Sequence, residues 1–403
     1  MFLLKPLVAW LTALLIVDAA ELLDFGTKAD VIPNAYIVVM KDRVSSNEFT
    51  SHVDWLENAH RTNLAKRGSV FTEGLKSTWD FDGWQAYSGK FDNDTLQEIL
   101  EHQDVAFVEP NGRFQINSPI GSFKQTNTTW GLARISHKAV NGSNYDYVTK
   151  HGEGEGLTFY GIDTGIDIHH SEFGNRARWG TNVVDSLDKD CVGHGTHTAA
   201  TAAGKSFGIL KKASVVSVKV LDCEGSGDAE GTINGILWAA NDAREKDLLG
   251  KSVMNLSLSG PRSKSLNEFM VRTQAAGIFV AVAAGNGGRN ASFVSPGSAP
   301  ELCTVAASTQ NDTQAFFSNY GEAVDLFAPG VGVLSAIPGN RTGIMSGTSM
   351  ASPHVCGVGG LLMAAEGIAA DKVCDRLKEL ANPVIKYTRI RTTNKLLYND
   401  SGA

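Results

Sequence analysis

The segment "GLTFYGID", residues 156–163, is apolar over most of its length and does not alternate with polar residues. A strand buried on both faces of a sheet has this pattern, because helices cover both of its sides. Three later segments share it: "SVVSVKVLD" (214–222), "KSVMNLSLS" (251–259) and "IFVAVAAGN" (278–286). Helical patterns at 231–248 and 265–277 separate them. The sequence therefore predicts an α/β fold, a three-layer sandwich with a mainly parallel central sheet.

The N-terminal third has a different organisation. Strand and helix patterns follow one another there in the order β-α-β-β-α-β, which is typical of a ferredoxin-like α+β motif. The clearest are the strands "AYIVVM" (35–40) and "WQAYSGKF" (84–91) and the helix "DTLQEILEHQ" (94–103). The polar, turn-rich segment "NSPIGSFKQTNTT" (117–129) then marks a linker. We expect a small α+β domain in front of a larger α/β domain.

Residues 1–20 predict a secretory signal peptide. They hold one lysine, a short apolar run from Leu7 to Val17, and small residues at Ala19 and Ala20. This run is too short to span a bilayer, so we expect a secreted, extracellular protein instead of a membrane-anchored one. Asn-x-Ser/Thr sequons fit a secreted glycoprotein. The candidate glycosylation sites are Asn127, Asn141, Asn290, Asn311, Asn340 and Asn399.

The charge pattern excludes one class of partner. The formal net charge of −7 comes from the acidic N-terminal third, and the sequence has no basic tract or basic face. A nucleic-acid partner is therefore not expected. The long apolar run at 351–370 contains Pro353, His354 and Glu366, so it predicts a buried helix and not a membrane span. We expect a monomer without a membrane partner.

Three short clusters carry candidate catalytic residues. Asp163 ends the strand "GLTFYGID", His194 lies between two glycines in "GHGTH", and Ser349 begins a predicted helix in "SGTSMASPHV". A serine is a poor nucleophile unless a base takes its proton and a carboxylate fixes the tautomer of that base. Strand ends and helix starts allow such distant residues to converge. The helix N-terminus also offers backbone N–H groups where an oxyanion would form.

Each of these residues also has a purely structural interpretation. Asp163 could form a turn, His194 could line a tight loop, and Ser349 could cap the helix. A secreted serine esterase is one alternative, because "GKSFG" (204–208) matches the G-x-S-x-G elbow. That elbow needs a preceding strand, however, and this segment follows a helical stretch. An inactive protease-like binding protein is another alternative, although it would be expected to lack one of the three residues.

The segments "DTGID", "GHGTHTA" and "GTSMASPHV" resemble the three signature segments of subtilisin-like serine proteases. They resemble most the proteinase K branch and the secreted proteases of dermatophyte fungi, and the order Asp, His, Ser is that of subtilisin. The resemblance implies an endopeptidase without a catalytic cofactor. Ser349 would be its nucleophile, His194 its general base and acid, and Asp163 the residue that orients His194. "AVAAGNGG" resembles the oxyanion strand, which implies that the Asn286 amide joins the Ser349 N–H.

Two further segments resemble the strands that bind extended protein or peptide substrates by β-addition in this family. They are "GSG" and "SLSG". The substrate-binding residues that this implies are Gly225, Ser226, Gly227, Ser257, Leu258 and Ser259. Ser259 departs from the usual "SLGG", which affects side-chain preference. Ala229 implies a roomy subsite for a distal hydrophobic residue.

The acidic N-terminal domain resembles the inhibitory propeptide of these proteases through "AYIVVMK", "YSGKF" and "VAFVEP". The resemblance implies a propeptide over 21–121 and a catalytic domain over 122–403. The propeptide would assist folding, block the cleft and be removed by the enzyme itself between Asn117 and Lys124. The alternative is a permanent regulatory domain.

All five cysteines lie in the larger domain. The resemblance implies that Cys191 pairs with Cys223 and that Cys303 pairs with Cys374, since relatives have cysteines at these places. Cys356 then has no partner, and its place in the predicted buried helix implies an inert free thiol.

The resemblance also implies a structural calcium ion. In relatives one such ion is bound by two backbone carbonyls and an aspartate, at positions that match Pro300, Leu302 and Asp325. Hard oxygen ligands of this kind suit Ca²⁺. The alternative is that Asp325 caps a turn.

Overall fold

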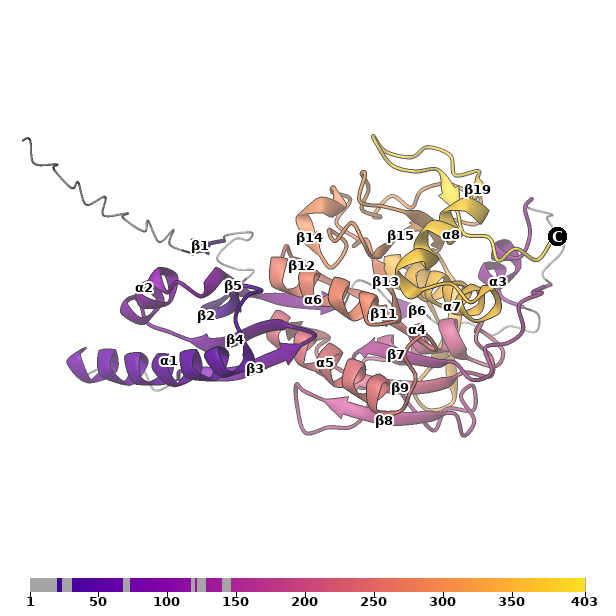
Figure 1. The fold of residues 1–403 in the computed structure, drawn as a ribbon. Helices are drawn as coiled ribbons and strands as arrows, with labels where there is room; N and C mark the ends of the chain where they lie inside the picture. The colour runs from indigo at the N-terminus through magenta and orange to yellow at the C-terminus, as the bar shows by residue number, and fades with distance from the viewer. Residues whose placement is uncertain are drawn as a thin grey trace, which may run out of the picture.

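The computed structural model describes most of the chain as two bodies that one long strand joins (Figure 1). The described residues are 20–23, 31–67, 73–116, 120–121, 128–139 and 146–402. The predicted signal peptide lies outside them except for its last residue, and the sequons at Asn127 and Asn141 also lie outside. The smaller body precedes residue 117 and the larger body follows residue 127.

The larger body is built on a nine-stranded sheet. The strands lie in the order β19 (Asn382–Pro383), β20 (Lys395–Leu396), β16 (Leu326–Pro329), β15 (Cys303–Ser308), β13 (Ile278–Ala283), β11 (Ser252–Leu256), β7 (Thr158–Asp163), β9 (Ser214–Lys219) and β8 (Ala177–Asn182). All neighbouring pairs from β20 to β8 are parallel. Among these described strands only the edge strand β19 is antiparallel to its neighbour.

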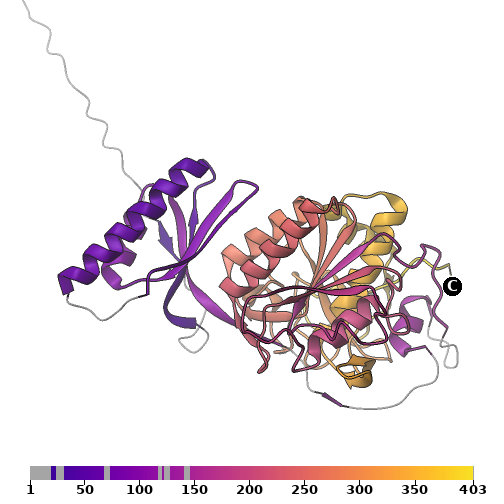
Figure 2. The same cartoon turned by 90° about the horizontal axis from the view of Figure 1, so that it is seen from below.

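Helices cover both faces of this sheet (Figure 2). One face carries α4 (His194–Ala203), α7 (Thr348–Glu366) and α8 (Val373–Leu380), and the other carries α5 (Ala229–Glu245) and α6 (Lys264–Ala275). Within β7, Phe159 packs into the core beneath α7 and Tyr160 into the core beneath α5 and α6. Neighbouring residues of a strand point to opposite faces, so a strand between two helical layers is apolar throughout. The prediction of a three-layer α/β fold is confirmed.

Some strands of the sheet carry no clear signal in the sequence. β8 is half-buried at the edge of the described sheet and reads "ARWGTN", which is not an apolar run. The predicted strand at 251–259 is in fact two strands. β11 ends at Leu256, and β12 (Leu258–Pro261) leaves the central sheet to pair with the smaller body. This break places Ser257 at the end of the sheet.

Helix α7 lies against the centre of the sheet because two of its glycines allow a close approach. A Cβ atom at Gly359 would lie 2.1 Å from Cε1 of Phe279 on β13. A Cβ atom at Gly360 would lie 3.0 Å from Cγ1 of Val253 on β11. The helix is buried from its first residue to Met363. The position of its N-terminus is therefore fixed by packing against the strands.

The smaller body is an α+β sandwich. Its elements are β2 (Val31–Met40), α1 (Ser46–Arg67), β3 (Leu75–Phe81), β4 (Trp84–Lys90), α2 (Asn93–Glu101) and β5 (Val105–Ile116). The strands pair antiparallel in the order β5-β2-β4-β3, and both helices cover one face. This is the ferredoxin-like arrangement that the sequence predicts.

The uncovered face of the smaller sheet packs against α5 and α6 (Figure 1). Trp84 meets Phe269 of α6 with ring centroids 5.0 Å apart. The buried carboxylate of Glu109 accepts hydrogen bonds at the N-terminus of α6, from Ser263 Oγ and from the backbone N–H of Lys264 at 2.8 Å. Burial raises the pKa of Glu109, while these hydrogen bonds oppose that rise. A carboxylate at this end of a helix is favoured by the helix dipole.

The free cysteine provides a test of the packing around α7. Cys356 is fully buried, has no disulfide partner, and burial raises the pKa of its thiol well above the usual range. We expect no labelling by a water-soluble thiol reagent in the native protein and one labelled thiol per chain after denaturation. Rapid labelling of one thiol in the native protein would contradict the buried position.

Candidate active site

Asp163 and His194 come together at the carboxyl end of the sheet. Asp163 is the last residue of β7, and His194 is the first residue of α4. His194 Nδ1 lies 2.7 Å from Asp163 Oδ1, and each residue is 1% exposed. Since a carboxylate only accepts, Nδ1 carries the proton in this bond. Nε2 of a neutral His194 is then the proton acceptor.

Ser349 is the second residue of α7, and it is fully buried. Its Oγ donates to the backbone carbonyl of Ser257 at 3.0 Å, and Ser257 Oγ donates to the carbonyl of Ser349 at 2.7 Å. The buried Nε2 of His194 has no hydrogen-bond partner among the described residues. The Ser349 hydroxyl is thus directed to Ser257 in this structure and not to the imidazole.

The motif "GHGTH" contains a second histidine, and the structure separates the two. Nε2 of His197 donates to the backbone carbonyls of Val333 at 3.0 Å and Gly343 at 3.2 Å. Burial, and then the charge of His194, lower the pKa of His197 to about 3. His197 is therefore a neutral residue that holds a hairpin, and His194 alone of the two contacts Asp163.

Asn286 follows β13 and is oriented by the first residue of α7. Its Oδ1 accepts hydrogen bonds from the backbone N–H and the Oγ1 of Thr348, both at 2.9 Å. Thr348 Oγ1 in turn accepts from the backbone N–H of Gly285 at 3.1 Å. These bonds fix the carboxamide with its amide nitrogen opposite to Thr348. Sequence reasoning missed Thr348, because a threonine at a helix start has many possible partners.

Asp190 is a second residue that the sequence did not identify. Gly193, the N-cap of α4, has a positive φ of 89° and no side chain with which to cap the helix. Asp190 caps it instead: Oδ1 accepts from the Gly193 N–H at 2.8 Å, and Oδ2 accepts from the Thr196 N–H at 2.9 Å. Thr164, next to Asp163, also donates to Asp190 at 2.8 Å. Asp190 therefore connects the segments that carry Asp163 and His194.

The two predicted substrate segments flank the last strand of the smaller body. β10 (Ser226–Asp228) and β12 both pair antiparallel with β5. On one side Gly227 is opposite Phe114, and on the other Ser259 is opposite Gln115. Gly225 precedes β10 in a turn with φ 75°. The end of the smaller body thus forms the middle strand between the two segments.

The comparisons with known proteins agree with this geometry. Residues 155–402 match the model of the Subtilase family, and residues 35–117 match that of Peptidase inhibitor I9. The chain belongs to the subtilase family. It is a subtilisin-like serine protease with an I9 propeptide.

Individual relatives support the assignment to the subtilases. The chain is 65% identical to Subtilisin-like protease 12 of Arthroderma gypseum and 64% identical to that of Trichophyton verrucosum, in both cases over 100% of each chain. A solved structure of a cold adapted subtilisin-like serine proteinase matches with a TM-score of 0.64 and 39% identity. That match covers 68% of this chain and 99% of the other.

This subtilase contains the two cysteine pairs that the resemblance implied. Cys191–Cys223 links the segment before α4 to the segment before β10, and Cys303–Cys374 links β15 to α8. The first bond holds the loop of Asp190 beside one of the two predicted substrate segments. The second holds α8 at the side of the sheet.

The asparagines of the candidate glycosylation sites differ in how exposed they are. Asn311 and Asn340 are exposed, and Asn290 is half-buried. Asn399 was a wrong candidate: it is fully buried, and its Nδ2 donates to the carbonyl of Val148 at 2.6 Å. A glycan on that nitrogen would break this bond and would have no space.

Among the described residues no helix is both long and apolar enough to cross a membrane.

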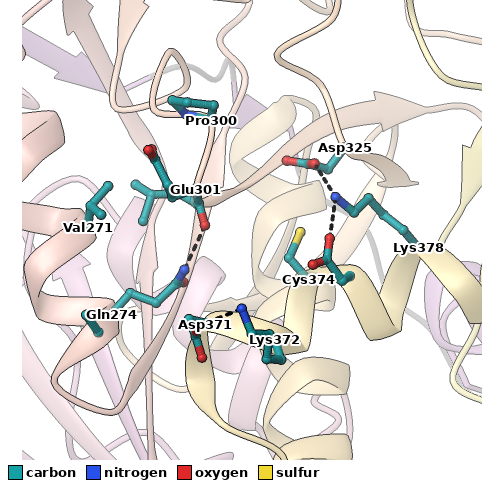
Figure 3. Close-up of a pocket in the computed structure, with 12 residues that line it drawn as sticks. Val271, Gln274, Pro300, Glu301, Asp325, Asp371, Lys372, Cys374 and Lys378 are labelled. Atoms are coloured by element: carbon teal, nitrogen blue, oxygen red, sulfur yellow. Dashed lines mark hydrogen bonds and ion pairs between the residues drawn. The ribbon is translucent and has the colours of Figure 1, made fainter.

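The predicted calcium ligands line one pocket of about 340 Å³ (Figure 3), and Asp163, His194 and Ser349 are not among its lining residues. Pro300, Leu302 and Asp325 all border it. Helix α8 supplies a further wall, which includes Lys378. The ammonium group of Lys378 lies 3.2 Å from Asp325 Oδ1, so the carboxylate already has a cationic partner.

The hydrogen bonds that the buried Asp190 accepts should contribute measurably to the stability of the folded protein. In a Ser349→Ala background, which removes the serine hydroxyl, Asp190→Asn should lower the free energy of unfolding by about 2 kcal/mol, because an amide cannot accept all of these hydrogen bonds. Denaturant unfolding measures the difference. The matched control is Asp188→Asn, because Asp188 is exposed two residues away. Equal stability of the two variants would contradict the capping role.

Proposed function

We propose that Ser349 is the nucleophile, that His194 is its general base and then general acid, and that Asp163 holds His194 in the required tautomer. The observation that supports this most directly is the buried bond between His194 Nδ1 and Asp163 Oδ1 at 2.7 Å. It leaves Nε2 as the acceptor for a serine proton. The position of Ser349 in the first turn of α7 adds backbone N–H groups where negative charge would develop.

The reaction begins when the Ser349 hydroxyl turns from Ser257 to His194. Oγ attacks the peptide carbonyl as its proton passes to Nε2. The Asn286 amide and the Ser349 N–H then stabilise the oxyanion. His194 returns the proton to the leaving amine, so that an acyl-enzyme forms, and a water molecule hydrolyses this ester by the same route.

The pairing of β5 suggests how substrates bind. An extended peptide would take the place of β5 between β10 and β12 and would gain affinity through backbone hydrogen bonds. Phe114, which is fully buried opposite Gly227, would correspond to a distal hydrophobic side chain of the substrate. Ala229, buried in the same apolar cluster, leaves space for such a side chain.

The same pairing supports self-processing. Ile116 is opposite Leu258, and the residue before Leu258 is Ser257, which contacts Ser349 Oγ. In this register Asn117 would come opposite Ser257, so the bond nearest to the nucleophile would be the one that follows Asn117. We propose cleavage between Asn117 and Ser118, which releases the propeptide from a secreted zymogen. The mature protease would be an extracellular monomer that digests proteins, without a nucleic-acid or membrane partner.

Loss of the nucleophile tests this proposal. Ser349→Ala and His194→Ala should each leave the zymogen uncut and abolish casein hydrolysis, whereas Ser346→Ala should process normally. Ser346 is a suitable control because its Oγ only accepts from the Gly332 N–H among the described contacts. Mass spectrometry of the mature chain should show Ser118 as its first residue. Normal processing by Ser349→Ala would refute the mechanism, and a different first residue would refute the cleavage site.

The oxyanion arrangement gives a graded prediction. Asn286→Ala should lower kcat by about 10²–10³-fold, as an equivalent change does in subtilisin. Thr348→Val should lower kcat by roughly 10-fold, because one of two hydrogen bonds to Asn286 Oδ1 is lost. Thr348→Ser should retain most of the activity, and KM should change little in all three. An unchanged kcat in Thr348→Val would show that Thr348 does not orient Asn286.

A further inference from the structure

Lys378 lines the pocket at α8 and contacts two carboxylates. Lys378 Nζ lies 3.2 Å from Asp325 Oδ1 and 2.8 Å from Asp375 Oδ1 (Figure 3). Asp325 precedes β16, whereas Asp375 and Lys378 are one turn apart on α8. One ammonium group therefore bridges a carboxylate next to the sheet and a carboxylate of the helix.

Both carboxylate oxygens of Asp325 contact other groups of the protein. Its Oδ2 accepts from the backbone N–H of Thr304 at 2.9 Å, and Oδ1 faces Lys378. The side chain is 17% exposed, and that of Lys378 is 32% exposed. The pair is thus partly shielded from water. A carboxylate without a partner would be unfavourable in such a place.

The residues present do not fit a calcium ion in this arrangement. Calcium needs six to eight oxygen ligands at about 2.3–2.6 Å. An ion at that distance from Asp325 Oδ1 would lie beside the ammonium group that already contacts this oxygen, and the two cations would repel each other. Cys303 and Cys374 also lie close to Asp325, but their disulfide removes them as metal ligands.

We propose that the ammonium group of Lys378 takes the place of a calcium ion here. It neutralises Asp325 and connects α8 to β16, the strand that follows Asp325. The neighbouring Cys303–Cys374 disulfide ties the same helix to β15. A lysine is a compact point charge on a flexible stem, so it can replace a cation where no directional coordination is needed. The proposal concerns stability and does not depend on the catalytic roles of Asp163, His194 and Ser349.

The test compares melting temperatures in EDTA and in millimolar Ca²⁺. All chains carry Ser349→Ala, which prevents self-digestion under the proposed mechanism. Two chains keep Lys378: the parent and its Asp325→Asn variant. Calcium should change the melting temperature of both by the same amount, because calcium does not bind Asp325. Lys378→Met should melt lower in EDTA and gain a calcium-induced shift of roughly 2–4 °C. Adding Asp325→Asn to Lys378→Met should remove that gain.

Two controls define the role of the charge. Lys372→Met should behave like the parent chain, because Lys372 borders the same pocket but pairs with Asp371. Lys378→Arg should also gain no calcium response. The proposal is overturned if calcium raises the melting temperature of the parent chain and Asp325→Asn abolishes that rise. It is also overturned if Lys378→Met gains no calcium-induced rise in melting temperature. The first comparison needs no change at Lys378, so it decides the question even if Lys378→Met fails to fold.

Discussion

The contact between α7 and the central sheet is the constraint on which the rest of the site depends. Gly359 lets the helix lie directly against the ring of Phe279, with no room even for a Cβ atom between them. The helix therefore cannot shift without opening the core. Its first turn is therefore held where Thr348 reaches Asn286 and Ser349 reaches Ser257. The geometry around Ser349 is thus a consequence of helix–sheet packing, because α7, Asn286 and Ser257 belong to three separate segments that meet at one end of the sheet.

The propeptide lies beside the same end of the sheet, where its last strand pairs with the segment that follows Ser257. Its strand β5 occupies the place between β10 and β12, while its sheet buries apolar surface against α5 and α6. Glu109 adds a carboxylate at the N-terminus of α6. A strand without these contacts would be held in this place by its backbone pairing alone. The additional apolar and capping contacts would help this segment to stay between β10 and β12 as an inhibitor.

Sequence reasoning reached the fold class, the family and the residues of the motifs, because these depend on local patterns. Asp163, His194 and Ser349 each stand in a short segment with a distinct composition. Asp190 and Lys378 were not found, since their roles arise from partners in other segments of the chain. Asn399 failed as a glycosylation candidate for a related reason: a sequon records three residues, but not the burial of the asparagine.

The proposed role of Lys378 follows a physical argument about occupancy. A bound calcium ion stabilises a protein only to the extent that free calcium exceeds its dissociation constant. A lysine carried by α8 is present at every calcium concentration, although it offers one charge instead of two and binds without a coordination shell. Together with the Cys303–Cys374 bond it would hold α8 to the sheet. For a protease, local opening exposes backbone to cleavage by other copies, so a permanent cation at this position would limit self-digestion wherever calcium is scarce.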